Sequence, residues 1–375
     1  MKTKGAILWG LNEPWSVEEI EIGDPVAGEV QIRMEAAGMC HSDHHIVTGS
    51  MPMASFPVMG GHEGSGVITK LGPEVKDLEV GDHVVLSFVP ACGRCPACSA
   101  GHQNLCDLGM GLLSGLAISD GTFRIHARGE NVIPMCLLGT FSPYMVVHET
   151  SVVKIDKDIP FDVAALVGCG VPTGWGSATR MAEVKPGESV VIMGVGGVGM
   201  SALQGAVASG ARQIFAIDPV PWKREQALKF GATHAFESAA AAIEPIIALT
   251  NGLMAQKTII TVGEMHGEYV EEALLLTSKF GTCVVTAMGA MTDMDVKLNL
   301  FLFSMLQKDW KGTIFGGGNA RVEIPNLLAM YKSGQLNLDD MITHTYSLEG
   351  VNDGYQDMLD GKNIRGVIRY TEADW

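Results

Sequence analysis

The chain has 375 residues, of which 47% are hydrophobic and 18% charged, and its formal net charge is −16. This length predicts two or three domains, and the composition excludes a disordered chain because it provides enough apolar residues for large buried cores. The negative charge argues against nucleic-acid binding, since that function draws on clustered lysine and arginine.

No apolar run approaches the roughly 18 residues that a membrane-spanning helix needs, and the apolar stretch near Met1 is too short for a signal peptide. Eight cysteines could form disulfides in an oxidising compartment, but four of them fall in one short segment with metal-ligand spacing. We therefore expect a soluble cytoplasmic protein that does not contact a membrane.

The N-terminal part of the chain, to about residue 165, consists of short candidate strands separated by glycine and proline. Examples are residues 29–34, 66–70 and 83–88. Strands of this length and spacing predict an antiparallel, barrel-like β domain.

From about Asp162 onward, apolar strands alternate with helical stretches. The strands are 189–193, 213–217, 257–262 and 282–286, and the helices include 200–209, 222–230 and the alanine-rich 239–242. This alternation predicts a parallel sheet covered by helices. A last segment, from about Ile314, mixes helix and strand.

A glycine-rich loop follows the strand at 189–193 and precedes a helix. It has the pattern G-x-G-x-x-G and comprises Gly194, Val195, Gly196, Gly197, Val198 and Gly199. In a dinucleotide-binding fold the first glycine permits the tight turn, the second lets the backbone approach the pyrophosphate, and the third lets the helix pack on the sheet. The helix N-terminus attracts the phosphate charge. A glycine-rich turn that binds no ligand is the alternative.

Asp218 ends the next strand, where a carboxylate can accept hydrogen bonds from the adenosine ribose. A carboxylate there repels a 2′-phosphate, so we expect NAD rather than NADP. Lys223 follows on the next helix and could reach the ribose, or it could be an ordinary solvated charge.

A cysteine lobe has the pattern C-x2-C-x2-C-x7-C, formed by Cys92, Cys95, Cys98 and Cys106. Four thiolates around a tetrahedral zinc ion leave no open position, so the pattern predicts a structural zinc site. An iron–sulfur cluster is the alternative metal group, because the spacing alone does not distinguish the two. A disulfide pair is the alternative without metal.

Three further candidate metal ligands, Cys40, His62 and Cys169, are far apart in the sequence. Each has an ordinary structural interpretation, because free cysteines are often buried and a lone histidine is more often a core residue than a ligand. The residues by themselves do not gather these three into one site.

The motifs of the chain resemble those of the zinc-containing alcohol dehydrogenases of the medium-chain dehydrogenase/reductase superfamily. The first is Gly61-His62-Glu63-x2-Gly66-x5-Gly72-x2-Val75. The match covers essentially the whole chain. Beside the cysteine lobe and the glycine-rich loop, it includes segments 40–45, 120–122, 168–170, 310–317 and 361–365.

The resemblance implies an α/β fold in three parts. These are a GroES-like β-rich catalytic domain with the cysteine lobe over 1–170, a Rossmann domain with a doubly wound parallel sheet over 171–313, and a return segment, 314–375, that completes the catalytic domain. It also implies oxidation of an alcohol to an aldehyde, or the reverse, with two zinc ions per chain and NAD. A homo-oligomer is expected.

The family holds its catalytic zinc ion through residues that match Cys40, His62 and Cys169, with water or substrate oxygen in the fourth place. The metal lowers the pKa of an alcohol there, which favours hydride departure to the nicotinamide ring. Glu63 matches a residue near the metal that can be a transient ligand. Asp43 matches the carboxylate that orients the histidine ligand.

The resemblance also implies a proton relay in which Ser42 accepts the alcohol proton and His45 releases it to solvent, a step that suits histidine near neutral pH. His41, Thr173 and Arg365 match positions that contact the cofactor. His41 and Arg365 would lie near its phosphates.

The substrate pocket is expected to include Phe88, Ser42 and Met110. Met110 stands where glutathione-using formaldehyde dehydrogenases place an arginine for a carboxylate, which favours an uncharged alcohol over the alternative substrate, a formaldehyde–thiol adduct (an S-(hydroxymethyl)thiol). Likeness around 41–45 and 179–187 indicates the nicotinoprotein branch, the nitrosoaniline-dependent alcohol dehydrogenases, in which NAD stays bound and an external electron acceptor reoxidises it. A non-catalytic protein with the inherited fold would be expected to have lost a metal ligand or a relay residue.

Overall fold

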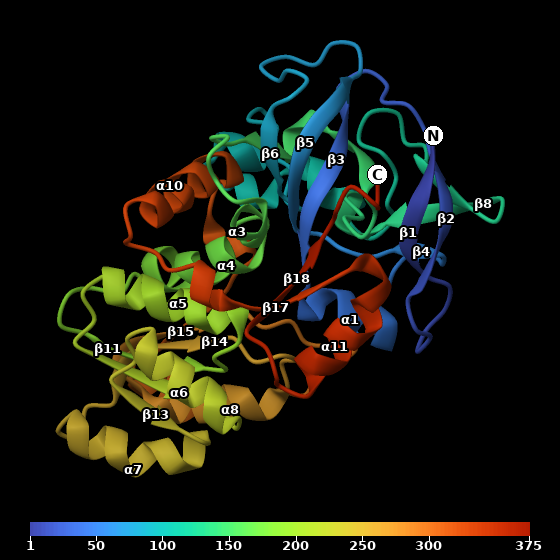
Figure 1. Ribbon diagram of the computed structural model, residues 1–375. Coiled ribbons are helices and arrows are strands. Elements are labelled where there is room, and N and C mark those ends of the chain that lie inside the picture. Colours follow the sequence, from blue (N-terminus) through green and yellow to red (C-terminus); the bar gives the residue numbers. More distant parts are fainter. The chain divides into compact units, whose positions relative to one another are not determined.

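The computed structural model describes residues 1–375 and divides into two compact units (Figure 1). Unit 1 comprises Met1–Cys169 and Asn319–Trp375, and unit 2 comprises Gly170–Gly318. The divisions expected from the sequence, after residues 170 and 313, differ from these by a few residues. No helix is long and apolar enough to cross a membrane.

Unit 1 is built around two β-sheets. One closes into a barrel in the order β1-β2-β7-β8-β4, and the other is seven-stranded in the order β10-β6-β5-β3-β18-β17, with β9 also paired to β3. The strands are β1 (Lys2–Leu8), β2 (Ser16–Ile22), β3 (Glu29–Gly38), β4 (Val58–Met59), β5 (Gly64–Leu71), β6 (His83–Leu86), β7 (Ile125–Ala127), β8 (Glu130–Pro134), β9 (Tyr144–His148), β10 (Val152–Lys154), β17 (Ile342–Tyr346) and β18 (Arg365–Arg369). Most pairs are antiparallel, as predicted, but β4–β8 and β17–β18 are parallel.

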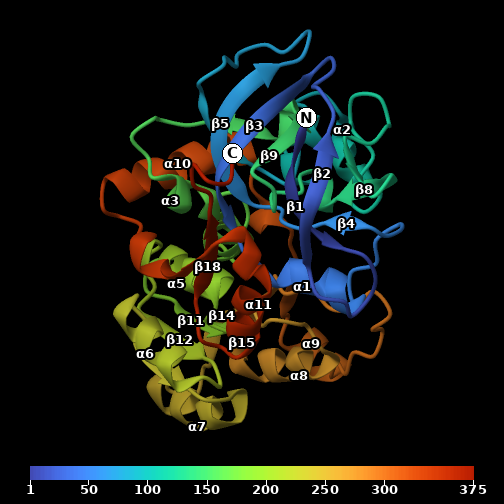
Figure 2. The ribbon, with the colours of Figure 1, turned by 45° about the vertical axis from the view of Figure 1, so that its right-hand side comes forward.

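The helices of unit 1 are α1 (His41–Thr48), α2 (Pro96–Ser99), α3 (Phe161–Leu166), α10 (Ala320–Lys332) and α11 (Val351–Leu359). α1 and α11 lie side by side in both views (Figures 1 and 2). The return segment adds β18 antiparallel to β3, so residues near the C-terminus complete a sheet begun near the N-terminus. β3 is buried along most of its length because it pairs with β5, β9 and β18.

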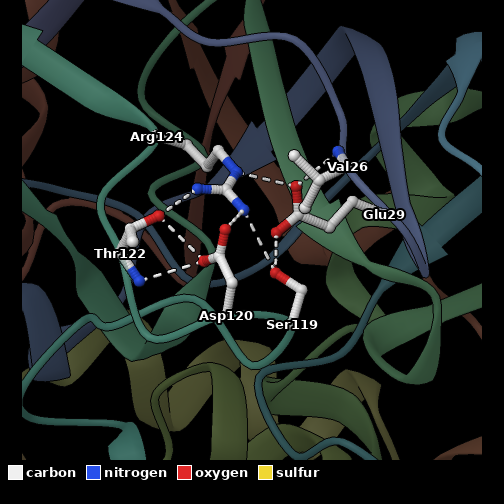
Figure 3. A network of polar contacts seen from close by, with 6 residues as sticks. All are labelled: Val26, Glu29, Ser119, Asp120, Thr122 and Arg124. Carbon is white, nitrogen blue, oxygen red and sulfur yellow. Dashed lines mark hydrogen bonds and ion pairs between the residues drawn. The ribbon is translucent and has the colours of Figure 1, made fainter.

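A partly buried polar network fixes the loop before β7 against β3 (Figure 3). Arg124 donates to Glu29 at 2.7 Å through Nε and to Asp120 at 2.8 Å through Nη2. Ser119 donates to the other oxygen of Glu29, and Thr122 donates to Asp120. Because Glu29 is buried, the guanidinium charge compensates a carboxylate that would otherwise be costly to desolvate. The Asp-Gly-Thr motif at 120–122 thus anchors a loop.

Unit 2 contains a six-stranded sheet in the order β13-β12-β11-β14-β15-β16, and every pair in it is parallel, as predicted. The strands are β11 (Ser189–Met193), β12 (Gln213–Ile217), β13 (His234–Phe236), β14 (Ala255–Ile260), β15 (Thr277–Val285) and β16 (Asp309–Gly312). The helices are α4 (Gly170–Gly176), α5 (Gly197–Ala208), α6 (Pro221–Lys229), α7 (Ala239–Leu249), α8 (Gly267–Leu276) and α9 (Leu300–Met305). Apolar side chains of α7 and α8 share one core with β11, β12, β14 and β15.

Some predicted boundaries in unit 2 were wrong. α5 begins at Gly197 rather than at residue 200, because the glycine-rich loop itself runs into the first helical turn. The alanine-rich patch at 239–242 is only the first turn of α7, which continues to Leu249. β15 starts at Thr277, earlier than expected, because its first residues are polar and give no apolar signal.

Candidate functional site

The four cysteines of the lobe converge, with their sulfur atoms within 4.8 Å of one another. Cys92 Sγ lies 3.9 Å from Cys98 Sγ, and Cys95 Sγ lies 3.9 Å from Cys106 Sγ. A tetrahedral zinc ion with Zn–S bonds of about 2.3 Å holds its sulfur ligands roughly 3.8 Å apart. All eight cysteines are free thiols, so the disulfide alternative is wrong, and the spacing of the lobe sulfurs fits a structural zinc ion.

The electrostatics of the lobe also fit a cation. Burial opposes ionisation of Cys92, but backbone N–H groups of Arg94 and Cys95 lower its pKa to about 6. Burial raises the pKa of Cys98 to about 12. Four sulfur atoms at this separation cannot all be thiolates without a compensating charge, which a zinc ion supplies.

Cys40, His62 and Cys169 form the second cluster, and their ligand atoms also lie within 4.8 Å of one another. All three belong to unit 1. Cys40 directly precedes α1, and His62 lies between β4 and β5. His62 and Cys169 are buried. The structure therefore gathers the three residues that the sequence alone left separate.

His62 provides the test of whether this cluster fits a metal ion. Its Nδ1 lies 3.3 Å from Asp43 Oδ1, whereas its Nε2 is buried without a hydrogen-bond partner. Buried polar atoms are rarely left unsatisfied, so a ligand for Nε2 is expected. A hydrogen bond from Cys169 lowers the pKa of Cys40 well below its ordinary value, and the same contact raises the pKa of Cys169. One nitrogen and two sulfurs fit a zinc ion with one open position.

Asp43 connects the segments that carry the ligands. Its Oδ1 accepts a hydrogen bond from Gly61 N at 2.8 Å as well as facing His62, and its Oδ2 accepts one from Cys40 N at 3.3 Å. Burial opposes a charge on His62, but Asp43 raises its pKa well above the ordinary value. Gly61, the residue before His62, has φ +88°, and a Cβ there would lie 2.3 Å from Thr140 Oγ1. Only glycine therefore fits at this position.

Glu63 and Arg365 form a buried ion pair in which Arg365 Nη2 donates to Glu63 Oε1. Burial raises the pKa of Glu63, and the charge of Arg365 opposes this rise. Arg365 begins β18, so the return segment supplies the partner of a residue next to His62. No sequence pattern predicted this pair. The expected roles, Glu63 as a transient metal ligand and Arg365 as a phosphate contact, stay predictions.

The expected relay residues lie on α1. Cys40 Sγ lies 3.7 Å from Ser42 Oγ, so this hydroxyl is adjacent to a candidate metal ligand. His45 is three residues further along the helix, on the same face as Ser42, and is buried. The rings of His41 and His45 are 6.3 Å apart. The structure thus brings these three residues together, and their roles stay predictions.

The two other expected pocket residues are placed very differently. The Phe88 ring meets the His62 ring edge-on, with centroids 5.7 Å apart. Met110 lies in a short 3₁₀ turn just after the last lobe cysteine, and its side chain is 89% exposed. Unit 1 therefore places Phe88 beside the buried cluster and gives no support to Met110 as a pocket residue.

The glycine-rich loop of unit 2 joins β11 to α5 in a tight turn. Gly194 has φ +85°, and a Cβ on Gly199 would lie 2.0 Å from the Gly194 carbonyl oxygen. A Cβ on Gly196 would meet nothing within 4 Å, which leaves its backbone open to a ligand. Thr261 Oγ1 donates to the Gly194 carbonyl at 2.6 Å, a contact that no sequence signal predicts.

Asp218 directly follows β12 and supports this loop. Its carboxylate accepts hydrogen bonds from Val195 N and Val220 N, both at 2.9 Å. Lys223 lies in the first turn of α6, and Thr173 lies on α4 with a buried hydroxyl that has no hydrogen-bond partner. The ribose and cofactor contacts of these side chains stay predictions.

Two family models match the chain. The model of the alcohol dehydrogenase GroES-like domain matches residues 26–157, and that of the zinc-binding dehydrogenases matches 197–333. Alcohol dehydrogenase B of Mycobacterium tuberculosis (strain ATCC 25618 / H37Rv) is 65% identical over 374 residues, which cover 100% of both proteins. The chain belongs to the zinc-containing alcohol dehydrogenases of the medium-chain dehydrogenase/reductase superfamily. The protein is therefore an oxidoreductase that uses zinc to oxidise alcohols, which confirms the prediction made from its motifs.

Other members of the family share the whole length of the chain. The NDMA-dependent alcohol dehydrogenase of Amycolatopsis methanolica is 46% identical over 371 residues, or 99% of this chain and 100% of that protein. The crystal structure of benzyl alcohol dehydrogenase from Acinetobacter calcoaceticus has a TM-score of 0.91 at 28% identity and covers 99% of this chain and 100% of its own. The predicted GroES-like and cofactor-domain fold is thereby confirmed.

Proposed function

We propose that the protein oxidises an uncharged alcohol to an aldehyde and transfers the hydride to an NAD molecule that stays bound through turnover. The cluster of Cys40, His62 and Cys169, with its unsatisfied Nε2 and one open position, carries this proposal. When bound, zinc lowers the pKa of the alcohol hydroxyl, and NAD accepts the hydride. Unit 1 supplies the metal ligands and unit 2 the nucleotide-binding loop.

The residues of unit 1 then have separate tasks. Ser42 Oγ, next to Cys40, accepts the proton of the substrate hydroxyl, and His45, on the same face of α1, takes it onward. Asp43 holds His62 in the orientation that leaves the buried Nε2 available as a metal ligand.

The charge balance of the site favours an uncharged substrate. The two thiolates of Cys40 and Cys169 balance the two charges of a zinc ion, and Arg365 balances Glu63. The ring of Phe88 adds an apolar surface beside His62. Aromatic and short aliphatic alcohols are therefore the first substrates to assay, and likeness to benzyl alcohol dehydrogenase adds benzyl alcohol.

Retention of NAD is proposed from likeness to the NDMA-dependent relative together with the loop of unit 2. Asp218 carries a negative charge next to the loop, which disfavours a 2′-phosphate and therefore NADP. An external electron acceptor would then reoxidise the bound nucleotide.

A homo-oligomer is proposed from the surface of unit 2. α9, labelled in Figure 2, has no buried residue. Its side chains Leu300, Phe301 and Met305 are exposed. β16 is the last strand of its sheet, with one edge unpaired. Exposed apolar side chains beside a free strand edge favour contact with a second copy of the chain. None of the eight cysteines forms a disulfide, which fits a reducing compartment such as the cytoplasm.

The deciding experiment measures zinc and nucleotide on extensively dialysed protein, then alcohol oxidation with and without added NAD and a nitrosoaniline acceptor. Two zinc ions, one NAD per chain and turnover that needs the acceptor but ignores added NAD are expected. Release of free NADH would contradict NAD retention. Activity on formaldehyde only with a low-molecular-weight thiol would replace the simple alcohol by a thiol adduct.

A further inference from the structure

Tyr355, on α11, lies in an aromatic cluster with Trp15 and Phe141. Its ring centroid is 6.3 Å from each of the other two rings, and Trp15 meets Phe141 edge-on at 6.0 Å. Asn352 fixes the helix to this cluster, because its side chain accepts a hydrogen bond from Trp15 N and donates one to Trp15 O. The position of the Tyr355 ring is therefore set by contacts from three parts of unit 1.

The hydroxyl of Tyr355 is buried and has no partner at hydrogen-bonding geometry. Burial raises the pKa of this phenol well above its ordinary value, and the charge of the nearby Asp43 carboxylate raises it further. Asp43 is fully buried, and its known donors are the backbone N–H groups of Cys40 and Gly61 together with His62. A buried carboxylate gains from each further donor.

The aromatic cluster and α11 each pack against one of the two segments that lead to metal ligands. A Cβ on Gly60 would lie 2.7 Å from Phe141 and 2.8 Å from Trp15, so the cluster sits directly on the chain before His62. A Cβ on Gly354 would lie 2.5 Å from Met39, the residue before Cys40. α11 thus contacts the chain next to Cys40 directly, and reaches the chain next to His62 through the aromatic cluster that contains Tyr355.

We propose that Tyr355 is a positioning residue of the catalytic metal site, whose hydroxyl donates to Asp43 and holds this carboxylate against His62 and the Cys40 backbone. The inference rests on the zinc site of the proposed function. Tyr355 acts through Asp43 and touches neither metal nor substrate. The C-terminal helix α11 thereby becomes a support of the metal site.

The test is Tyr355→Phe, which keeps the ring in its cluster and removes only the hydroxyl. Zinc release to a chromogenic chelator is followed for both zinc ions of each chain. We expect the catalytic zinc to bind about tenfold more weakly, in the range found for outer-sphere partners of metal ligands, while the lobe zinc is unchanged. A cobalt-substituted variant should show a shifted visible spectrum, because the histidine ligand is less firmly oriented.

Tyr346→Phe is the matched control, because the Tyr346 hydroxyl bonds Asp357 at 3.0 Å and has no link to Asp43. It should retain both zinc ions as the wild type does. Unchanged catalytic zinc in Tyr355→Phe, or equal loss of both zinc ions, would overturn the proposal.

A double-mutant cycle with Asp43→Asn tests the partner directly. In the Asp43→Asn background, Tyr355→Phe should have little further effect on the affinity for the catalytic zinc. An undiminished effect there would also overturn the proposal. A wild-type chain with only the lobe zinc would instead refute the proposed function itself.

Discussion

The two metal sites of unit 1 are assembled in opposite ways. The ligands of the lobe lie within residues 92–106, and backbone N–H groups of the same segment orient them, as Cys95 N does for Cys92 Sγ at 3.3 Å. The catalytic cluster takes Cys40, His62 and Cys169 from three distant segments. Side chains such as Asp43 orient its ligands. The local site can form from its own segment, whereas the dispersed site forms only when the whole unit has folded.

The number of ligands separates the sites by function. Four sulfur ligands close the coordination of the lobe, so its zinc ion can only stabilise. Three ligands leave the buried cluster one position for substrate. Changes to the two sites should therefore separate activity from stability.

The largest expected effect comes from Cys169→Ala. It removes a ligand of the catalytic zinc and with it several kcal/mol of transition-state stabilisation, so activity should fall by about a thousandfold or more. Metal analysis should find one zinc ion per chain, and the melting temperature should change little because the lobe is intact. Two retained zinc ions with normal activity would show that Cys169 is not a ligand.

Cys95→Ala tests the other side of the comparison. Loss of the lobe zinc is comparable to loss of a native cross-link, about 2–5 kcal/mol, which lowers the melting temperature by roughly 10 °C. Below that temperature the variant should keep its catalytic zinc and most of its kcat. Loss of the catalytic zinc from protein that is still folded would mean that the two sites depend on each other.

Asp43→Asn should weaken binding of the catalytic zinc by about 10–100-fold, since the amide cannot replace the charge that holds His62. The control is Asp107→Asn beside the lobe, where the backbone N–H of Asp107 contacts Cys95 Sγ and the side chain is exposed. That variant should leave the lobe zinc unchanged. Equal effects of the two substitutions, followed by chelator titration, would remove the distinction between side-chain and backbone support.

The smallest effect is expected outside both sites, at the ion pair of Lys154 and Asp82, 2.8 Å apart. Burial raises the pKa of Asp82, but Lys154 and the Glu79 N–H outweigh this and lower it below 3.8. The pair therefore stabilises the fold above the ordinary pKa of an aspartate and loses this effect as pH falls through the lowered value. Lys154→Met should cost at most about 1 kcal/mol at pH 7, because Lys154 is half exposed. Urea unfolding at pH 7 and pH 3 should show the difference shrink, and at pH 7 the variant should keep both zinc ions.

Sequence patterns predicted those parts of the molecule whose causes are local. β11 and β12 have the bounds expected from the sequence, because strands buried in a parallel sheet are uninterrupted apolar runs. The spacing of the four lobe cysteines alone predicts a metal site there. The pair of Glu63 and Arg365 joins residues 302 positions apart, and neither has a neighbour that signals the other. Tyr355 has the pattern of a core residue on an amphipathic helix, and this pattern does not show what its hydroxyl faces.

The return of the chain into unit 1 sets an order of events during synthesis. Cys40 and His62 leave the ribosome before unit 2, whereas α11, β18 and the partner of Glu63 leave it only after unit 2. Unit 2 is complete at Gly318 and can fold first, since domains fold as units while the chain grows. A chain terminated between Gly318 and α11 would thus retain its nucleotide-binding fold without a supported metal centre, so the ability to oxidise alcohols marks a chain translated through β18.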